Sequence, residues 1–178
     1  MRESVTAYVA LGANLGDPVA SVRKAMDDIA ALDGITLLKR SSLYRSAPLA
    51  SSGPDYINAV VKVSTRLSAP VLLSALQKIE QQAGRERPYP NAPRTLDLDL
   101  LIYGSASMGS AILVLPHPRM LERAFVLLPL FEIAPRCVTA AQLQAVQSQA
   151  IVRIGNVIAG SDPQSSAGIP LDPGSSPG

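Results

Sequence analysis

Two aspartates lie two residues apart in the segment Arg94-Thr95-Leu96-Asp97-Leu98-Asp99-Leu100. Side chains alternate between the two faces of a β-strand, so a strand here would place Asp97 and Asp99 on one face and the leucines on the other. Adjacent carboxylates repel each other unless a cation compensates them. Mg²⁺ suits such a pair because it takes oxygen ligands and commonly binds through one or two carboxylates plus substrate phosphates. The alternative is a solvated sheet face on which both aspartates pair with arginines.

Basic residues flank this acidic pair in the sequence. Arg85, Arg87 and Arg94 lie in the segment that leads into it, and His117 lies beyond it. Carboxylates that hold a metal beside arginines that pair with phosphate oxygens are typical of a nucleotide-polyphosphate site. The sequence contains no GxxxxGK[ST] phosphate loop, which excludes a P-loop enzyme. The GANLG segment at 12–16 resembles a glycine-rich phosphate loop only loosely, and the favoured alternative is a turn between a strand and a helix that Asp17 caps.

The elements that must position these residues follow from hydrophobic periodicity and capping signals. In chain order we expect a strand at 6–12, a helix at 18–32 that Asp17 caps, strands at 35–44 and 56–65, a helix at 68–84 and a strand at 96–103. This βαββαβ order predicts an α+β fold with a ferredoxin-like core, in which both helices pack on one face of an antiparallel sheet. The other face then needs cover or a ligand.

The remaining segments predict loops, additional C-terminal elements and a tail. Residues 45–55 contain Pro, Gly and Ser, and residues 85–93 contain three prolines, so both segments predict irregular loops. The additional elements expected after the core are a strand at 111–115, a helix at 120–130, a helical segment at 139–150 and a short strand at 151–154. The Ser-, Pro- and Gly-rich end cannot bury enough apolar surface to offset its ordering entropy. We therefore expect a single domain over 1–160 and a disordered tail over 161–178.

Composition narrows the class of protein. The chain has 178 residues, of which 47% are hydrophobic, which suffices for one globular domain. A formal net charge of +2 argues against a nucleic-acid or membrane-surface partner. The single cysteine excludes an intrachain disulfide and a cysteine-based zinc cluster. No signal peptide is expected, and no segment reaches the roughly 18 apolar residues of a membrane span. These observations predict a cytoplasmic protein, which we expect to be a monomer.

Five segments carry a more specific pattern: YVALGANLGD, YRSAPL, DYINAVV, PRTLDLDLLIYG and LPHPRMLERAFVLLPLFEIAP, which together span roughly residues 7–135. In this order they resemble the 6-hydroxymethyl-7,8-dihydropterin pyrophosphokinase family. The resemblance implies a Mg²⁺-dependent enzyme of folate biosynthesis. Such an enzyme transfers the β,γ-diphosphate of ATP to the hydroxymethyl oxygen of the pterin and releases AMP.

The resemblance also implies a role for individual residues. It places two Mg²⁺ ions at Asp97 and Asp99, in agreement with the alternation of side chains in a strand. The catalytic residues that it implies are Arg85, Arg87, Arg94, Asp97 and Asp99. The ATP-binding residues that it implies are Arg85, Arg87, Arg94, Leu100, His117 and Arg123. The pterin-binding residues that it implies are Ser46, Ala47, Leu49, Tyr56, Asn58 and Phe125.

The chemistry of the pterin-binding residues agrees with that assignment. Tyr56 and Asn58 are two apart on an expected strand and so share a face. An asparagine amide offers both a donor and an acceptor, which matches the aminopyrimidinone edge of a pterin, and aromatic rings can sandwich a flat heterocycle. The alternatives are that Tyr56 and Phe125 are ordinary core aromatics and that His117 packs between two prolines.

Two positions depart from the family pattern. Asn91 stands where many members have a tryptophan, so a contact to the pterin is either lost or supplied by Tyr89. Ile112 stands where some members have an arginine.

The competing function is a non-catalytic, small-molecule-binding regulatory domain of ferredoxin-like fold. Mg²⁺-dependent release of AMP distinguishes the two functions.

Overall fold

The computed structural model describes residues 3–48, 53–84 and 96–155. Several residues of the expected site lie outside these ranges, namely Leu49, Arg85, Arg87, Tyr89, Asn91 and Arg94. The expected disordered tail at 161–178 lies outside them as well, and both the tail and the domain boundary at 160 stay predictions.

The chain forms a mixed arrangement of helices and antiparallel strands. The elements are β1 (Val5–Ala13), α1 (Pro18–Ala30), β2 (Ile35–Arg40), β3 (Leu43–Ser46), β4 (Tyr56–Thr65), α2 (Ala69–Gly84), β5 (Asp97–Tyr103), β6 (Met108–Gly109), β7 (Val114–Leu115), η1 (Met120–Glu122), α3 (Ala124–Ile133), η2 (Pro135–Cys137), α4 (Ala140–Ala145) and β8 (Ile151–Gly155). The main sheet has the order β5-β1-β4-β3-β8, and β2 also pairs with β4. The expected α+β class with an antiparallel sheet is confirmed.

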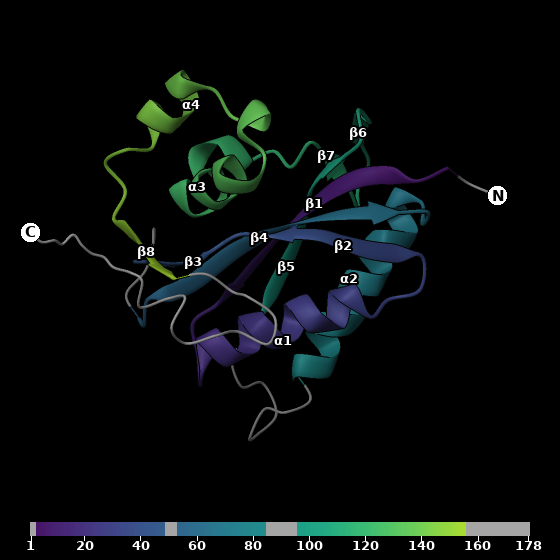
Figure 1. The fold of residues 1–178 in the computed structure, drawn as a ribbon, viewed down its shortest axis with the longest axis horizontal. Helices are drawn as coiled ribbons and strands as arrows, with labels where there is room; N and C mark the ends of the chain where they lie inside the picture. The colour runs from purple at the N-terminus through teal and green to yellow at the C-terminus, as the bar shows by residue number, and fades with distance from the viewer. Residues whose placement is uncertain (1–2, 49–52, 85–95, 156–178) are drawn as a thin grey trace, which may run out of the picture.

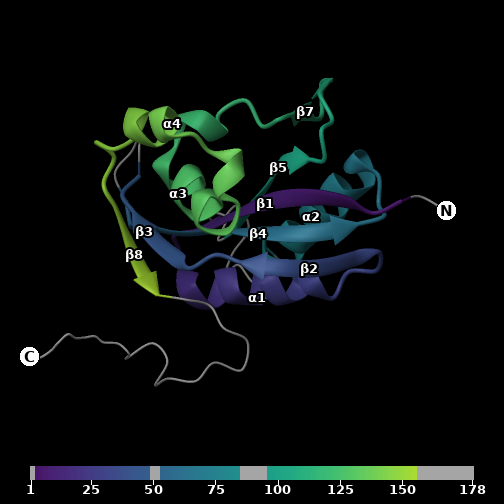
Figure 2. The same ribbon diagram turned by 45° about the horizontal axis from the view of Figure 1, so that its top comes forward.

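Helices lie on both faces of this sheet (Figures 1 and 2). On one face α1 packs against β1 and β4, and α2 packs against β5. The side chains buried there include Val9, Val61, Met26 and Leu72. On the other face α3 packs against β3 and β4 over a second core. The cover that this face requires therefore comes partly from α3.

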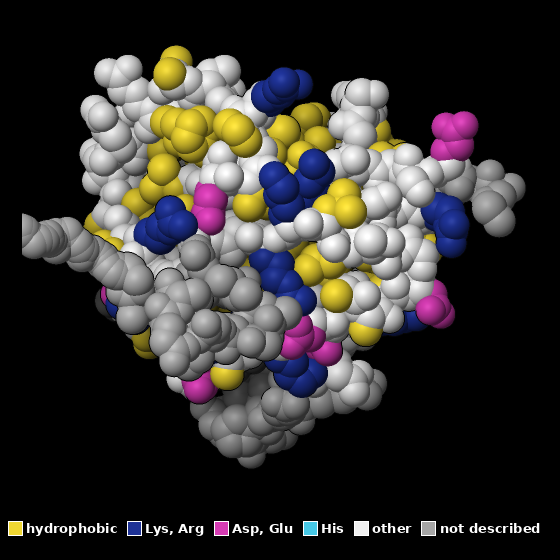
Figure 3. All heavy atoms as spheres, in the orientation of Figure 1, with side chains coloured by type: hydrophobic (Ala, Val, Ile, Leu, Met, Phe, Trp, Pro, Cys, Tyr) yellow, Lys and Arg dark blue, Asp and Glu magenta, His cyan; other side chains and the backbone are white. Residues whose placement is uncertain are grey.

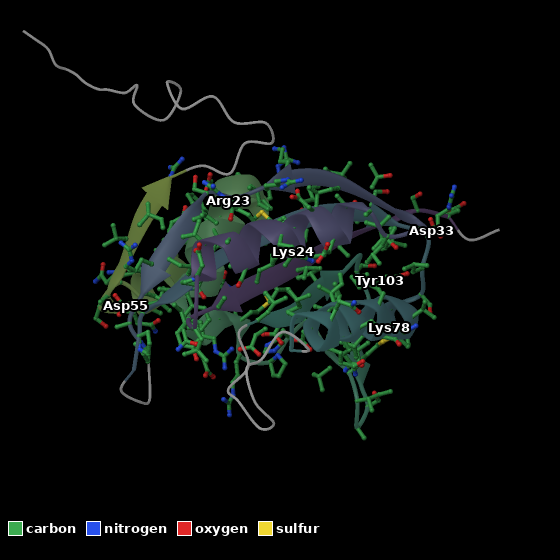
Figure 4. The ribbon with its side chains drawn as sticks, turned by 90° about the horizontal axis from the view of Figure 1, so that it is seen from below. Arg23, Lys24, Asp33, Asp55, Lys78 and Tyr103 are labelled. Carbon is green, nitrogen blue, oxygen red and sulfur yellow. The ribbon has the colours of Figure 1, made fainter. Side chains whose placement is uncertain are left out.

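Sequence patterns account for the two helices on the first face. The Asp17 side chain accepts a 3.1 Å hydrogen bond from the Ala20 amide, as an N-cap residue does, and Pro18 occupies the first turn. Figure 4 shows this face from outside, with Arg23 and Lys24 on α1 and Lys78 on α2. All three side chains are exposed, so the apolar sides of both helices face the sheet.

The expected single strand at 35–44 is wrong, because two strands occupy this region and the second continues to Ser46. The interruption lies at Ser41 and Ser42. The Ser41 amide donates to the Val60 carbonyl, and the Ser41 hydroxyl accepts from the Val60 amide, both at 2.9 Å. The Ser42 amide turns away from the ladder to Glu132 on α3. A side chain from a distant helix thus breaks the strand.

The elements after Gly104 also differ from the expectation. Only Val114–Leu115 of the expected strand at 111–115 pairs, with Met108–Gly109. The expected helix at 120–130 is divided at Arg123, whose extended backbone (φ −127°, ψ 116°) separates η1 from α3. The helix at 139–150 is limited to Ala140–Ala145, which begins with a capping box from Thr139. The short final strand is confirmed, because β8 pairs with β3.

Candidate functional site

A pocket of about 350 Å³ lies on the same face of the sheet as α3. Its lining residues come from β1, the end of β3, β4, β5 and the start of α3: Ala10, Leu11, Gly12, Ala47, Pro48, Tyr56, Asn58, Asp97, Asp99, Arg123, Phe125 and Val126. This volume is in the range of small-molecule sites. The pocket brings together seven residues that the sequence predicted for the site: Ala47, Tyr56, Asn58, Asp97, Asp99, Arg123 and Phe125.

Strand pairing explains why these residues meet. Gly12 of β1 pairs with Asn58 on one side and with Asp97 on the other. One pair further along β1, Ala10 lies beside Asp99. Residues directly opposite each other in an antiparallel sheet present their side chains to the same face. Asn58 and the two aspartates therefore face one pocket from either side of β1.

The expectation that both aspartates share a face is confirmed. Asp97 and Asp99 line the pocket, whereas Leu96, Leu98 and Leu100 are buried in the core beneath α1 and α2. The side chain of Asp99 is 46% exposed, and Asp97 is exposed as well, so a ligand can reach both carboxylates.

The candidate metal ligands in the pocket are the carboxylate oxygen atoms of Asp97 and Asp99. Among the residues with a described position, no cluster of three or more His, Cys, Asp or Glu side chains suited to a metal is formed. Two carboxylates that open into a pocket are ligands of the kind that Mg²⁺ uses when substrate phosphates complete its coordination shell.

A third carboxylate lies at the outer edge of β5, where Glu80 Oε2 accepts a 2.7 Å hydrogen bond from the Leu98 amide. Glu80 thereby anchors the backbone between the two aspartates, a role that the sequence did not indicate.

His117 lies beside the acidic pair, with its Nε2 atom 4.0 Å from Oδ1 of Asp99. Its Nδ1 atom accepts a hydrogen bond from the Arg119 amide, so a neutral imidazole carries its proton on Nε2. Burial lowers the pKa of His117, Arg123 and Arg119 lower it further, and Asp99 opposes them. The arrangement therefore favours a neutral ring that presents an N–H donor toward Asp99.

The opposite side of β1 offers buried polar groups and aromatic rings. Asn58 is only 3% exposed, and its Nδ2 atom donates a 2.7 Å hydrogen bond to the hydroxyl of Ser46, which is itself buried. Tyr56 and Phe125 are both half-buried and line the pocket. The Arg123 guanidinium lies 5.5 Å from the centre of the Phe125 ring, within the range of a cation–π contact.

Leu100, which was expected to bind ATP, does not reach the pocket with its side chain. That side chain is 2% exposed and points into the core beneath α1 and α2, so only its backbone could contact a ligand in the pocket. Figure 3 shows Lys and Arg side chains between α3 and the β6–β7 pair. This surface is viewed from the β2 edge of the sheet, whereas β5 and its two aspartates lie at the opposite edge.

Comparisons with known proteins show which family the sequence matches. Residues 8–135 match the family model described as 7,8-dihydro-6-hydroxymethylpterin-pyrophosphokinase (HPPK). A protein of Haemophilus influenzae named 2-amino-4-hydroxy-6-hydroxymethyldihydropteridine pyrophosphokinase is 47% identical over 131 residues, which are 73% of this chain and 82% of that protein. A protein of the same name from Synechocystis is 46% identical over 129 residues, 72% of this chain and 66% of that protein.

Longer proteins contain a similar region. The folic acid synthesis protein fol1 of Pneumocystis carinii is 42% identical over 128 residues, which are 71% of this chain but 17% of that protein. A crystal structure of HPPK-DHPS in complex with substrates has a TM-score of 0.58 at 13% identity, covering 81% of this chain and 43% of that one. A Plasmodium falciparum HPPK-DHPS structure has a TM-score of 0.56, covering 74% and 41%. At this identity the structures show similarity of fold alone.

Proposed function

Because this chain belongs to the 7,8-dihydro-6-hydroxymethylpterin-pyrophosphokinase family, we propose that it transfers diphosphate from ATP to 6-hydroxymethyl-7,8-dihydropterin and releases AMP in folate synthesis. The observation that carries this proposal is the division of one pocket into two chemically different ends. The Asn58 amide lies at one end, and the Asp97 and Asp99 carboxylates lie at the other, with only β1 between them.

The Asn58 end suits the acceptor substrate. A pterin has a flat aminopyrimidinone ring with donors and acceptors along one edge. A buried amide can pair with such an edge, and Tyr56 and Phe125 can contact the ring faces. The low exposure of Asn58 and its bond to Ser46 support a fixed orientation of this amide. In the proposal this end binds the pterin and directs its hydroxymethyl group across β1 toward the aspartates.

The aspartate end suits a metal-bound triphosphate. We propose that Asp97 and Asp99 hold two Mg²⁺ ions, for which their oxygen atoms are suitable ligands. The bound metal supplies positive charge that offsets the triphosphate and the charge that develops on the departing AMP oxygen. His117 would donate its Nε2 proton in a hydrogen bond to the nucleotide, and Arg123 would pair with phosphate oxygens.

The remaining expectations complete the proposal. Arg85, Arg87 and Arg94 would provide further cations for the triphosphate, and Leu49 would contact the pterin.

We infer a ferredoxin-like core from the strand order. In the order β5-β1-β4 followed by β2 and β3, each βαβ crossover passes over one intervening strand. Among the described residues, no helix has both the length and the apolar composition needed to cross a bilayer. Monomeric state, cytoplasmic location and the absence of nucleic-acid or membrane partners stay predictions from the sequence.

A direct measurement of both products tests the proposed reaction. The purified chain is incubated with ATP, Mg²⁺ and 6-hydroxymethyl-7,8-dihydropterin, and AMP and the pterin diphosphate are separated by chromatography. We expect equal amounts of both products, and no AMP when the pterin or Mg²⁺ is omitted. Binding of the pterin without release of AMP would favour the regulatory-domain alternative, which the pyrophosphokinase names of the relatives do not favour.

A further inference from the structure

Gly12 lies at the centre of the pocket floor. It is the β1 residue that pairs with both Asn58 and Asp97, and it lines the pocket together with Ala10 two residues earlier. Any ligand that reaches from the amide to the aspartates must therefore pass over this strand position.

The backbone does not require glycine at position 12. Gly16 and Gly104 have φ values of +65° and +54°, which disfavour any side chain, whereas Gly12 lies within a regular strand without a positive φ. Glycine weakens the interior of a strand relative to alanine, because it loses more conformational freedom on folding. Reasons other than backbone geometry must therefore explain the glycine: a Cβ would crowd the Asn58 side chain, and the close approach of a ligand is a second such reason.

The oxygen atom of the Asn58 side chain lies next to the position that a Cβ of residue 12 would take. A Cβ atom on residue 12 would lie 3.2 Å from Oδ1 of Asn58, which is closer than an ordinary van der Waals contact. The amide nitrogen of Asn58 is engaged by Ser46, but within the described part of the chain no hydrogen bond reaches Oδ1. A buried acceptor of this kind needs a partner, and a ligand above Gly12 can provide one.

We propose that Gly12 is part of the pterin site, and that its missing side chain allows the pterin ring to lie against β1 and donate to Oδ1 of Asn58. This inference rests on the proposed function and deepens it. A methyl group at position 12 would occupy the floor of the pocket and shield the acceptor, whereas the aspartate end would keep its geometry. Pterin binding should therefore weaken while nucleotide binding does not.

The test compares Gly12→Ala with the wild-type chain. Affinity for 6-hydroxymethylpterin is measured by its fluorescence, and affinity for a non-hydrolysable ATP analogue with Mg²⁺ is measured by calorimetry. We expect pterin binding to weaken by about tenfold or more and analogue binding to change by less than about twofold. Thermal unfolding is measured alongside, because the 3.2 Å contact requires the Asn58 side chain to shift and so offsets the gain from replacing glycine with alanine in a strand.

Gly109→Ala is the matched control, since Gly109 also lies in a strand without a positive φ and a Cβ there meets nothing within 4 Å. It should change neither affinity. Pterin affinity within about twofold of wild type for folded Gly12→Ala would overturn the inference while leaving the proposed function intact. A wild-type chain that binds no pterin would instead refute the proposed function.

A second pair of variants covers the case in which Gly12→Ala alone does not fold. In an Asn58→Ala background the oxygen atom that a methyl group would meet at 3.2 Å is absent, so the substitution at position 12 is accommodated. Adding Gly12→Ala to Asn58→Ala should still reduce the residual pterin affinity, because the methyl group fills the floor. An unchanged residual affinity in the double variant would overturn the inference in that case.

Discussion

The hydroxyl of Tyr44 donates a 2.8 Å hydrogen bond to Oε1 of Glu132, and this bond joins β3 to α3. The same carboxylate accepts from the Ser42 amide at 2.9 and 3.1 Å and from the Ser42 hydroxyl at 2.8 Å. Arg153 of β8 lies 3.6 Å away and compensates the charge. Glu132 follows Phe125 by seven residues, about two helical turns, so the two side chains share a face of α3. This cluster therefore fixes the helix that carries Phe125 against the strand beside Asn58.

Substitutions in this cluster should reduce stability in a defined order. Tyr44→Phe removes one hydrogen bond to a carboxylate and should lower the free energy of unfolding by about 1–3 kcal/mol. Glu132→Ala should lower it by more, because it leaves the donors of Ser42 and Tyr44 without their acceptor. Urea denaturation measures both values. Glu122→Ala, at an exposed acidic residue of η1, serves as the control and should cost little. Equal losses for Glu122→Ala and Glu132→Ala would contradict the role of the cluster.

The same cluster predicts a response to alkaline pH. Burial raises the pKa of Tyr44 well above its ordinary value of 10.0, the hydrogen bond and charge of Glu132 raise it further, and Arg153 partly opposes them. The unfolded chain would lose the Tyr44 proton near pH 10, while the folded chain keeps it. The stability that this proton contributes is therefore complete below about pH 10 and is lost as pH rises above it. Urea midpoints measured from about pH 8 to pH 11 should fall less steeply for Tyr44→Phe than for wild type. Parallel curves would contradict the shift.

Asp97→Asn and Asp99→Asn test the metal assignment. Each substitution keeps the shape of the side chain and removes one carboxylate charge from the pocket. We expect AMP formation to fall by on the order of a thousandfold or more, with thermal unfolding little changed. Asp27→Asn is a suitable control, because Asp27 lies on α1 with a side chain that is 69% exposed and pairs with Arg40. Turnover near the wild-type rate in either pocket variant would remove the metal from that residue.

Local patterns predicted the parts of the fold that depend on nearby residues. The alternation in Leu96–Leu100 placed both aspartates on one face, and Asp17 with Pro18 predicted the start of α1. The break between β2 and β3 was not predicted, because its cause is Glu132, which follows Ser42 by 90 residues. A long-range hydrogen bond of this kind leaves no periodic signal in a single sequence.

The pocket shows the same difference between what local sequence patterns predict and what long-range pairing determines. Asn58 and the aspartates could be identified individually from residue type and family pattern, but their separation by one strand depends on the pairing of β1 with β4 and β5. Gly12 was interpreted as the end of a strand and the start of a turn and received no role in the site, since its neighbours across the sheet are not visible in the sequence. Glu80 was not singled out for the same reason, although it holds the backbone of β5.

His117 offers a direct probe of the electrostatics of the pocket, because it is the only histidine in the chain. In the metal-free protein we expect its pKa to lie below the ordinary value of 6.5, mainly because the ring is partly buried. The unfolded chain then binds a proton that the folded chain does not, so stability is complete above about pH 6.5 and declines as pH falls below it. An NMR titration of the single imidazole resonance measures the pKa directly. Arg123→Gln should raise it by removing a positive charge, whereas Asp99→Asn should lower it further by removing a negative one. Shifts of the opposite sign would mean that neither side chain faces the imidazole as described.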